Sequence, residues 1–436
     1  MDQTEIDHIS KECHFTIRER KITAHELLEL ILFSPSNNYL PSLEDMSIVF
    51  LRKYKVEVSK QAIDKKFTAK SVVFIKIILE KALQRTLLNK DYAVPLPFNQ
   101  VRIKDSTCFN VPDALKEFYP GAGGRGNASK ATIRIQFEFD IKTGRIIELE
   151  LMPFLKQDQK KAKETIHKIE EGDLIIRDLG YFSIEALNSI NQKAYYISRL
   201  DTNTNMYEQR GNEYHEVNVE KIEKKLRENN LFYHEQAVFI GEERKIKARM
   251  IVFVVPEEVK NNRLREYYVK NRKVAIRKRK SILRAGVNIF ITNVQNEKIE
   301  AKNIRNVYAI RWQIELIFKG WKSIGQLDKV KKMKVQRFEF MLYARLLWLI
   351  INWKIIFNLD MVVYHQTGRL LSFYKILKYI DNYKEELRIA KNKTQQHIEY
   401  FLIELLKISK RKYIRTMHKK KVNLLDVINL LITQDK

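Results

Sequence analysis

Residues 308–322 read YAIRWQIELIFKGWK, and they bring four polar side chains to one side of a predicted helix. At 100° per residue, Tyr308, Arg311, Glu315 and Lys322 point at about 0°, 300°, 340° and 320°, within a wedge of about 60°. Two readings fit a carboxylate flanked by two cations and a phenol. It is either a metal ligand beside phosphate-binding groups or an ordinary ion-pair patch, since Arg311 and Glu315 would pair in any helix. The first reading requires further acids.

Two aspartates stand where strand patterns predict core side chains. Asp105 shares a strand face with the apolar Val101, and Asp178 ends the apolar strand expected at 173–178. Each aspartate alone could cap a strand or a turn. Clustered with Glu315, they would repel one another by about 4 kcal/mol per pair at 4 Å and an effective dielectric constant of 20. Such a cluster is tolerated chiefly when divalent cations neutralise it.

The segments around the aspartates predict an α/β fold. Alternating apolar residues indicate strands at 101–105, 131–139 and 146–152, a helix follows at 157–170, and a buried strand follows at 173–178. Three antiparallel strands, a helix and a fourth strand open the ribonuclease-H-like fold, although other α/β proteins share that order.

The regions on either side of these strands differ in pattern. The amino-terminal part is helical by apolar spacing, with helix-start signals at Ser42 and Ser59 that fit either a helix-turn-helix motif or a three-helix bundle. We expect five segments: a helical, DNA-binding region 1–95; a first core part 96–200; a β-rich insertion 201–286 with a basic run at 272–280; a second core part 287–335; and a helical basic region 336–436.

Charge narrows the choice of partners. The 436 residues hold 80 Lys and Arg against 53 Asp and Glu, a formal charge of +27. Such an excess favours nucleic acid over a membrane surface or an acidic protein. Cys13 and Cys108 fit no disulfide framework and indicate a reducing cytoplasm. Arg345 and Lys354 interrupt the apolar stretch 338–357, which predicts a buried helix and no membrane anchor.

The pattern Tyr308, Arg311, Glu315 and Lys322 resembles the signature of the DDE transposases of the insertion-sequence-4 family, which include the Tn-five and Tn-ten enzymes. That signature is tyrosine, two residues, arginine, three residues, glutamate, six residues and lysine. The family's second motif is similar to Asp178-Leu179-Gly180-Tyr181, and its first aspartate to Asp105-Ser106-Thr107. The resemblance spans roughly residues 100–325.

The resemblance implies a ribonuclease-H-like catalytic core with a β-rich insertion between helical flanks. It implies that Asp105, Asp178 and Glu315 are catalytic and bind two Mg²⁺ ions, with Mn²⁺ as a substitute. The residues implied to contact DNA are Tyr308, Arg311, Trp312 and Lys322. The reaction would be cut-and-paste transposition of double-stranded DNA, from terminal inverted repeats into a target, by a homodimer on the bacterial nucleoid in the cytoplasm. Cleavage would pass through a DNA hairpin.

One departure from the family concerns the insertion, where relatives carry a tryptophan that receives a flipped base. The four tryptophans here all lie outside 201–286, so either this role falls to a tyrosine or phenylalanine such as Tyr207, Phe232 or Tyr233, or the step differs. Two alternatives remain for the whole chain: another ribonuclease-H-like nuclease, or a transposase relative that binds DNA without cutting it.

Overall fold

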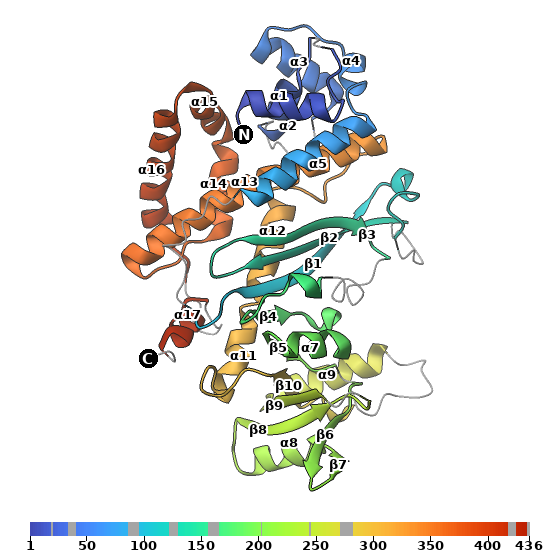
Figure 1. Ribbon diagram of the computed structural model, residues 1–436, viewed down its shortest axis with the longest axis vertical. Coiled ribbons are helices and arrows are strands. Elements are labelled where there is room, and N and C mark those ends of the chain that lie inside the picture. The colour runs from blue at the N-terminus through green and yellow to red at the C-terminus, as the bar shows by residue number, and fades with distance from the viewer. Residues whose placement is uncertain are drawn as a thin grey trace.

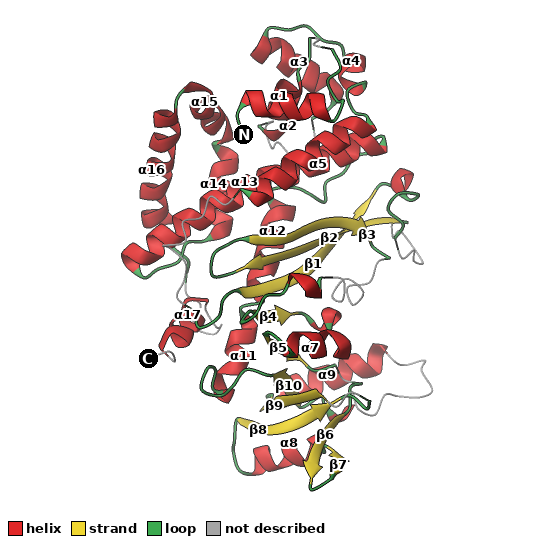
Figure 2. Ribbon diagram, viewed as in Figure 1, coloured by secondary structure: helices red, strands yellow, loops and turns green. Residues whose placement is uncertain are grey.

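The computed structural model describes residues 1–18, 21–33, 41–85, 96–121, 130–155, 165–201, 203–243, 246–270, 282–416 and 424–433. Helices gather at one end of the molecule, and the sheet runs through its middle and other end (Figures 1 and 2). The N-terminus lies at the helical end of the molecule (Figure 1).

The amino-terminal helices are α1 (Gln3–Glu12), α2 (Ala24–Leu32), α3 (Leu43–Tyr54), α4 (Lys60–Asp64) and α5 (Ala69–Gln84). Both predicted start signals are confirmed. Ser42 and Asp45 form a reciprocal capping box, and the Ser59 hydroxyl accepts a hydrogen bond from Ala62 N at 3.2 Å. Helix α5 lies side by side with the long helix α13 (Val335–Thr367; Figure 1), so this region packs against the rest of the chain.

Ten strands form one mixed sheet in the order β3-β2-β1-β4-β5-β10-β9-β8-β6-β7. The pairs β1–β4 and β4–β5 are parallel and the others antiparallel. The first five strands in this order make a ribonuclease-H-like core, which confirms the predicted fold. The strands are β1 (Val101–Val111), β2 (Ala131–Asp140), β3 (Ile146–Pro153), β4 (Leu174–Arg177), β5 (Tyr195–Arg199), β6 (Met206–Arg210), β7 (Glu213–Glu216), β8 (Tyr233–Ile240), β9 (Ile246–Val254) and β10 (Val287–Thr292).

Two details differ from the predicted pattern. The inserted strands continue the core sheet, because β9 pairs with β10, and the insertion also holds α8 (Val219–Glu228) and α9 (Glu257–Lys270). The expected helix 157–170 is wrong in its described part, which forms only the 3₁₀ turn η3 (Ile166–Lys168); the rest of that helix and the basic run 272–280 lie outside the described residues. Packing in the folded protein, and not local sequence preference, decides both the continued strand pairing and the short turn.

The two faces of the β1–β3 sheet differ in polarity. Alternate residues such as Phe137 and Phe139 face helices, and the Phe137 ring packs 4.8 Å from Trp321 and 6.0 Å from Trp353. The opposite face carries Arg102, Lys104, Glu138 and other charged residues that are nevertheless buried. This division places the odd-numbered residues of β1, among them Asp105, on the helix-covered side.

The carboxy-terminal helices are α13 (Val335–Thr367), α14 (Phe373–Asn382), α15 (Lys384–Lys393), α16 (Gln395–Lys412) and α17 (Leu424–Thr433). Helix α13 is long and apolar enough to cross a membrane, with a mean hydropathy of 1.7 in its most apolar window, but 67% of that window is buried inside the protein. It therefore serves as the central core helix, as the charges within 338–357 predicted.

Candidate active site

Parallel pairing of β1 and β4 brings the two predicted aspartates together. The last matched pair is Lys104 with Arg177, so Asp105 and Asp178 follow at the next position on neighbouring strands. Asp178 then stands at the N-cap position of the short 3₁₀ turn η4 (Leu179–Tyr181), without a side-chain capping hydrogen bond. Asp105 differs from its predicted place at a strand end, because β1 continues to Val111 through pairing with β2 after β4 has ended.

The predicted single helix over 308–322 is in fact two helices, α11 (Ala301–Ala309) and α12 (Trp312–Ser323). Between them the backbone bonds tighten to three-residue spacing: Arg311 N donates to Tyr308 O, and Ile314 N donates to Arg311 O, both at 3.1 Å. The side chains keep their helical spacing across this junction, because the backbone dihedral angles of Arg311 remain in the right-handed helical region. The predicted shared face is therefore retained although the straight helix is not.

The Arg311 guanidinium lies between the three acids. Its NH1 donates to Asp105 Oδ2 at 2.9 Å and its NH2 donates to Glu315 Oε1 at 2.7 Å. Its Nε lies 3.7 Å from Asp178 Oδ1, too far for a hydrogen bond, and is buried with no acceptor. The side chain of Arg311 is 10% exposed, whereas those of Asp178 and Glu315 are 44% and 35% exposed. Three segments far apart in the sequence thus meet at one cation.

Burial makes Asp105 costly to ionise. Its side chain is 17% exposed, and burial raises the pKa of its carboxyl to about 6, against the opposing effects of the Ser106 backbone N–H, 2.8 Å away, and of Arg311. A buried carboxyl group with a raised pKa, in contact with other charged side chains, is common at functional sites.

The donor set fits a divalent cation, though not in this side-chain arrangement. Within the described residues, no three His, Cys, Asp or Glu side chains lie close enough to share an ion. Asp105 and Glu315 nevertheless direct one oxygen each at the same guanidinium, and Asp178 stands beside it. Carboxylate oxygens are the ligands that Mg²⁺ prefers. Asp105, Asp178 and Glu315 are thus the candidate metal ligands at this place.

The other predicted DNA-contacting residues surround the acids. Lys322 Nζ donates to the carbonyl of Cys108 at 2.9 Å, farther along β1. The Tyr308 hydroxyl donates to Arg177 O at 3.3 Å, and burial raises the pKa of Tyr308 to about 12. Trp312 is 59% exposed, and its ring lies 5.8 Å from Arg311 Cζ. The structure thus brings the whole predicted set to one place.

Aromatic rings connect this site to the insertion. The ring of Tyr308 lies 5.3 Å from Phe290, which lies 5.8 Å from Phe253, which in turn lies 5.9 Å from Tyr233. Next to Tyr233 in the chain, Phe232 is 86% exposed. Of the three aromatic residues predicted to receive a base, Phe232 is thus the most exposed, while Tyr233 is 38% exposed.

Sequence reasoning missed a buried charged network behind the acids. Arg102 pairs with Glu138 at 2.8 Å and with Asp173 at 3.2 Å, while Lys104 contacts Glu138 at 3.5 Å and hydrogen-bonds Glu148. The signal was the run of charges at even-numbered positions of β1 and β2. Charges at alternate positions of a strand commonly face solvent, whereas here segment 165–173 helps to cover them.

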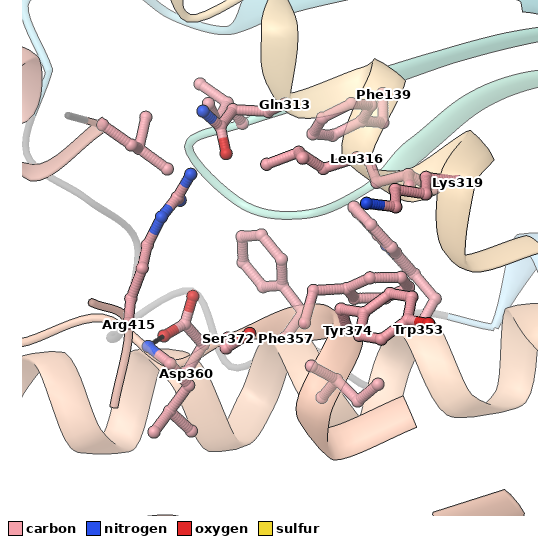
Figure 3. A pocket seen from close by; sticks show the side chains of 16 residues that line it. Phe139, Gln313, Leu316, Lys319, Trp353, Phe357, Asp360, Ser372, Tyr374 and Arg415 are labelled. Carbon is pink, nitrogen blue, oxygen red and sulfur yellow. Dashed lines mark hydrogen bonds between the residues drawn. The ribbon is translucent and has the colours of Figure 1, made fainter. Parts of the chain in front are cut away.

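A cavity of about 230 Å³ adjoins the back of α12, between α12 and helices α13 and α14 (Figure 3). Gln313, Leu316 and Lys319 of α12 form one wall of this cavity, and Asp360 and Arg415 belong to the opposite wall. Asp360 accepts a hydrogen bond from Leu371 N, and burial raises its pKa to about 7. The sequence carried no signal for this cavity, because its walls come from five separate segments.

The strand order and the meeting of three acids beside β1 and β4 define a class, the ribonuclease-H-like enzymes that act on polynucleotides. The family model described as "Transposase DDE domain" matches residues 96–351, and the chain belongs to this family. It is a DDE transposase, an enzyme that binds DNA and carries out cut-and-paste transposition in dependence on a divalent metal ion.

Several relatives match nearly the full chain. The transposase for insertion sequence element IS231D of Bacillus thuringiensis subsp. finitimus is 28% identical over 98% of this chain and 92% of its own length. The transposase for IS1151 of Clostridium perfringens is 28% identical over 99% of this chain and 94% of its own. Among solved structures, the piggyBac transposase synaptic complex with hairpin DNA aligns over 92% of this chain and 82% of that one, with a TM-score of 0.47 and 11% identity.

Proposed function

We propose that Asp105, Asp178 and Glu315 are the catalytic acids of this transposase and that they hold two Mg²⁺ ions, for which Mn²⁺ can substitute. The observation that supports this most is their convergence on one guanidinium from β1, from the end of β4 and from α12. Bound metal would activate water or a 3′ hydroxyl and stabilise the leaving oxygen. The three carboxylates fix where that chemistry occurs.

The surrounding residues would hold the DNA backbone. Arg311 and Lys322 offer two cations on the same side as the acids, and Tyr308 fixes the end of α11 against β4 through Arg177 O. Arginine binds phosphate in two parallel hydrogen bonds, whereas lysine acts as a point charge. We assign Arg311 and Lys322 to positioning the scissile phosphate and its neighbour, and Trp312 and Phe232 to stacking on bases exposed by distortion of the DNA end.

The remaining assignments extend this proposal to the whole protein. The helical region 1–95 would read the terminal inverted repeats, with Lys60 and Lys65 exposed on and beside α4. The region 336–436 would join two copies in the paired-end complex, and the division at 95, 200, 286 and 335 would separate functional units. The enzyme would act in the bacterial cytoplasm on the nucleoid, cutting repeats that flank its gene and inserting them into target DNA.

A cleavage assay on a labelled duplex from the DNA flanking the gene tests the assignment. Alanine at Asp105, Asp178 or Glu315 should abolish cutting in Mg²⁺ or Mn²⁺ while retaining end binding, because metal ligands and not phosphate contacts are removed. Retained cutting would remove that residue from the site. A wild-type protein that binds the ends but never cuts them would favour a relative that acts by binding alone.

A further inference from the structure

We infer that Arg311 closes the carboxylate site to metal in the free protein and opens it when a DNA phosphate takes its guanidinium. This inference rests on the proposed metal-binding role of the three acids. It adds a function for Arg311 before DNA arrives: the residue is a positioning residue that couples metal binding to DNA binding.

The first support is competition for the same oxygen atoms. Arg311 donates to Asp105 Oδ2 and to Glu315 Oε1, the two oxygens directed at the centre of the site. Each of these oxygens keeps a second lone pair, but a metal ion that both oxygens shared would occupy the space that the guanidinium fills at 2.7 to 2.9 Å from them, and would meet its positive charge. Guanidinium and metal therefore exclude each other at these atoms.

The second support is the spacing of the acids. Oxygens that share one Mg²⁺ ion at about 2.1 Å lie no more than about 4.2 Å apart. A planar guanidinium is wider than a metal ion, and with Arg311 in place no three acidic side chains of the described residues approach closely enough to bind an ion. Metal binding thus requires Arg311 to leave and the carboxylates to close.

The third support is that Arg311 is incompletely satisfied where it lies. Its Nε is buried without an acceptor, and the 3.7 Å separation from Asp178 is an ion pair but not a hydrogen bond. A phosphate can accept two parallel hydrogen bonds from one guanidinium. The exposed ring of Trp312 lies 5.8 Å from Arg311 Cζ, so an aromatic ring stands beside the guanidinium.

The consequence is a positive coupling between two ligands. Metal should bind the free protein weakly and the DNA-bound protein tightly, and by reciprocity metal should tighten the binding of the DNA end. Such an enzyme would acquire its cutting chemistry only after the end is in place. A direct contact between metal and phosphate also contributes to this coupling. The test therefore measures the part of the coupling free energy that is lost when Arg311 is replaced.

The experiment measures Mn²⁺ binding by the loss of the electron paramagnetic resonance signal of free Mn²⁺, in the full chain. The proteins are wild type, Arg311→Gln, Arg311→Lys, Asp105→Asn and the matched control Lys319→Gln. Lys319 lies one turn from Glu315 on α12, is exposed and contacts the Tyr374 ring, so its loss removes an equal charge without touching the acids. Each protein is titrated alone and with a saturating duplex that ends at the cleavage position in a terminal phosphate, which supplies the phosphate for Arg311 but leaves no bond to cut.

Without DNA, Arg311→Gln should bind Mn²⁺ about tenfold more tightly than wild type, a change within the range typical of coupled sites. Lys319→Gln should stay within roughly twofold, because exposed charges are screened. Arg311→Lys should fall between wild type and Arg311→Gln, since a single ammonium cannot bridge two carboxylates in the same geometry. With DNA, the gain in affinity should be about tenfold smaller in Arg311→Gln than in wild type.

Two failures are distinguishable. If Asp105→Asn loses Mn²⁺ binding but Arg311→Gln binds no more tightly than Lys319→Gln, or shows the same gain with DNA as wild type, the inference is wrong and the metal site stands. If no protein binds Mn²⁺ with or without DNA, the proposed metal site and the inference are both wrong. Thermal unfolding of each variant confirms that the titrated protein is folded, and Arg311→Lys gives the same comparison if Arg311→Gln does not fold.

Discussion

Replacing Asp105 by asparagine should abolish DNA cleavage and at the same time stabilise the metal-free protein. The reason is that Asp105 carries its charge at a cost. Its carboxyl is largely buried, and burial raises its pKa to about 6 from the ordinary 3.8. Asparagine has nearly the same shape, can still accept the hydrogen bond from Ser106 N, and carries no charge.

The magnitude follows from the pKa shift. A rise of about 2 units corresponds to about 3 kcal/mol, and the pairing of Asp105 with Arg311 is already included in that shift. Between pH 4 and pH 6 the folded protein holds more protons than the unfolded chain, so stability falls as the pH rises through this window. Above pH 6 the full cost is present, and asparagine removes it.

Urea unfolding in the presence of EDTA at several pH values between 4.5 and 8 would measure this difference. Wild type and Asp105→Asn should unfold at similar urea concentrations near the acid end of the range, and the variant should be more stable by up to about 3 kcal/mol above pH 6. A variant that is less stable than wild type at pH 7.5, by an amount that does not change with pH, would show that Asp105 is a structural ion-pair partner and refute the reasoning.

Four further outcomes are expected. Glu315→Gln should lose strand cleavage on a labelled end fragment while gel-shift binding persists, because the amide cannot replace a charged metal ligand. Lys322→Gln should weaken the DNA complex and lower the slope of log affinity against log salt by about one, which filter binding at several salt concentrations measures. Trp312→Ala should slow hairpin closure and spare the first nick on denaturing gels; equal loss of both steps would make Trp312 a packing residue. Asp360→Asn should be more stable than wild type above pH 7 and not below pH 5, since burial raises the Asp360 pKa to about 7, and urea midpoints at pH 5 and 8 test this.

Most of the site was predictable because its members obey local periodicity. Tyr308, Arg311, Glu315 and Lys322 fall on one face of a helical repeat, and Asp105 lies on the core-facing side of a strand. Such patterns depend only on backbone geometry, which the helix junction at Arg311 disturbs little. The junction itself was not predictable, because the switch from four-residue to three-residue hydrogen bonds leaves the apolar spacing unchanged.

The position of the Arg311 guanidinium could not be derived from the sequence. Arg311 and Asp105 are 206 residues apart, and their contact depends on how α12 packs across β1. The pattern predicted an Arg311–Glu315 pair in any exposed helix, and that pair does form at 2.7 Å. What distinguishes the site from an ordinary ion pair is the arrival of two more acids from the sheet, which only the tertiary structure supplies.

The charges on the two sides of the sheet explain why the acids are left with one cation. Lys104 and Arg177, which precede Asp105 and Asp178, turn to the opposite face and share Glu138. Within the described part of the chain, Arg311 is the cation that contacts all three acids, so the group carries a charge of −2. With two Mg²⁺ ions in place of the guanidinium, the net charge of the carboxylates and metal ions would be +1. One scissile phosphate would then bring this net charge to zero. Arg311 adds a charge of +1 wherever it binds, but among the acids it would lie next to two dications, whereas on the phosphate it has an anionic bidentate partner. The distribution of charge therefore favours the exchange in which Arg311 moves from carboxylate to phosphate as the metal ions enter.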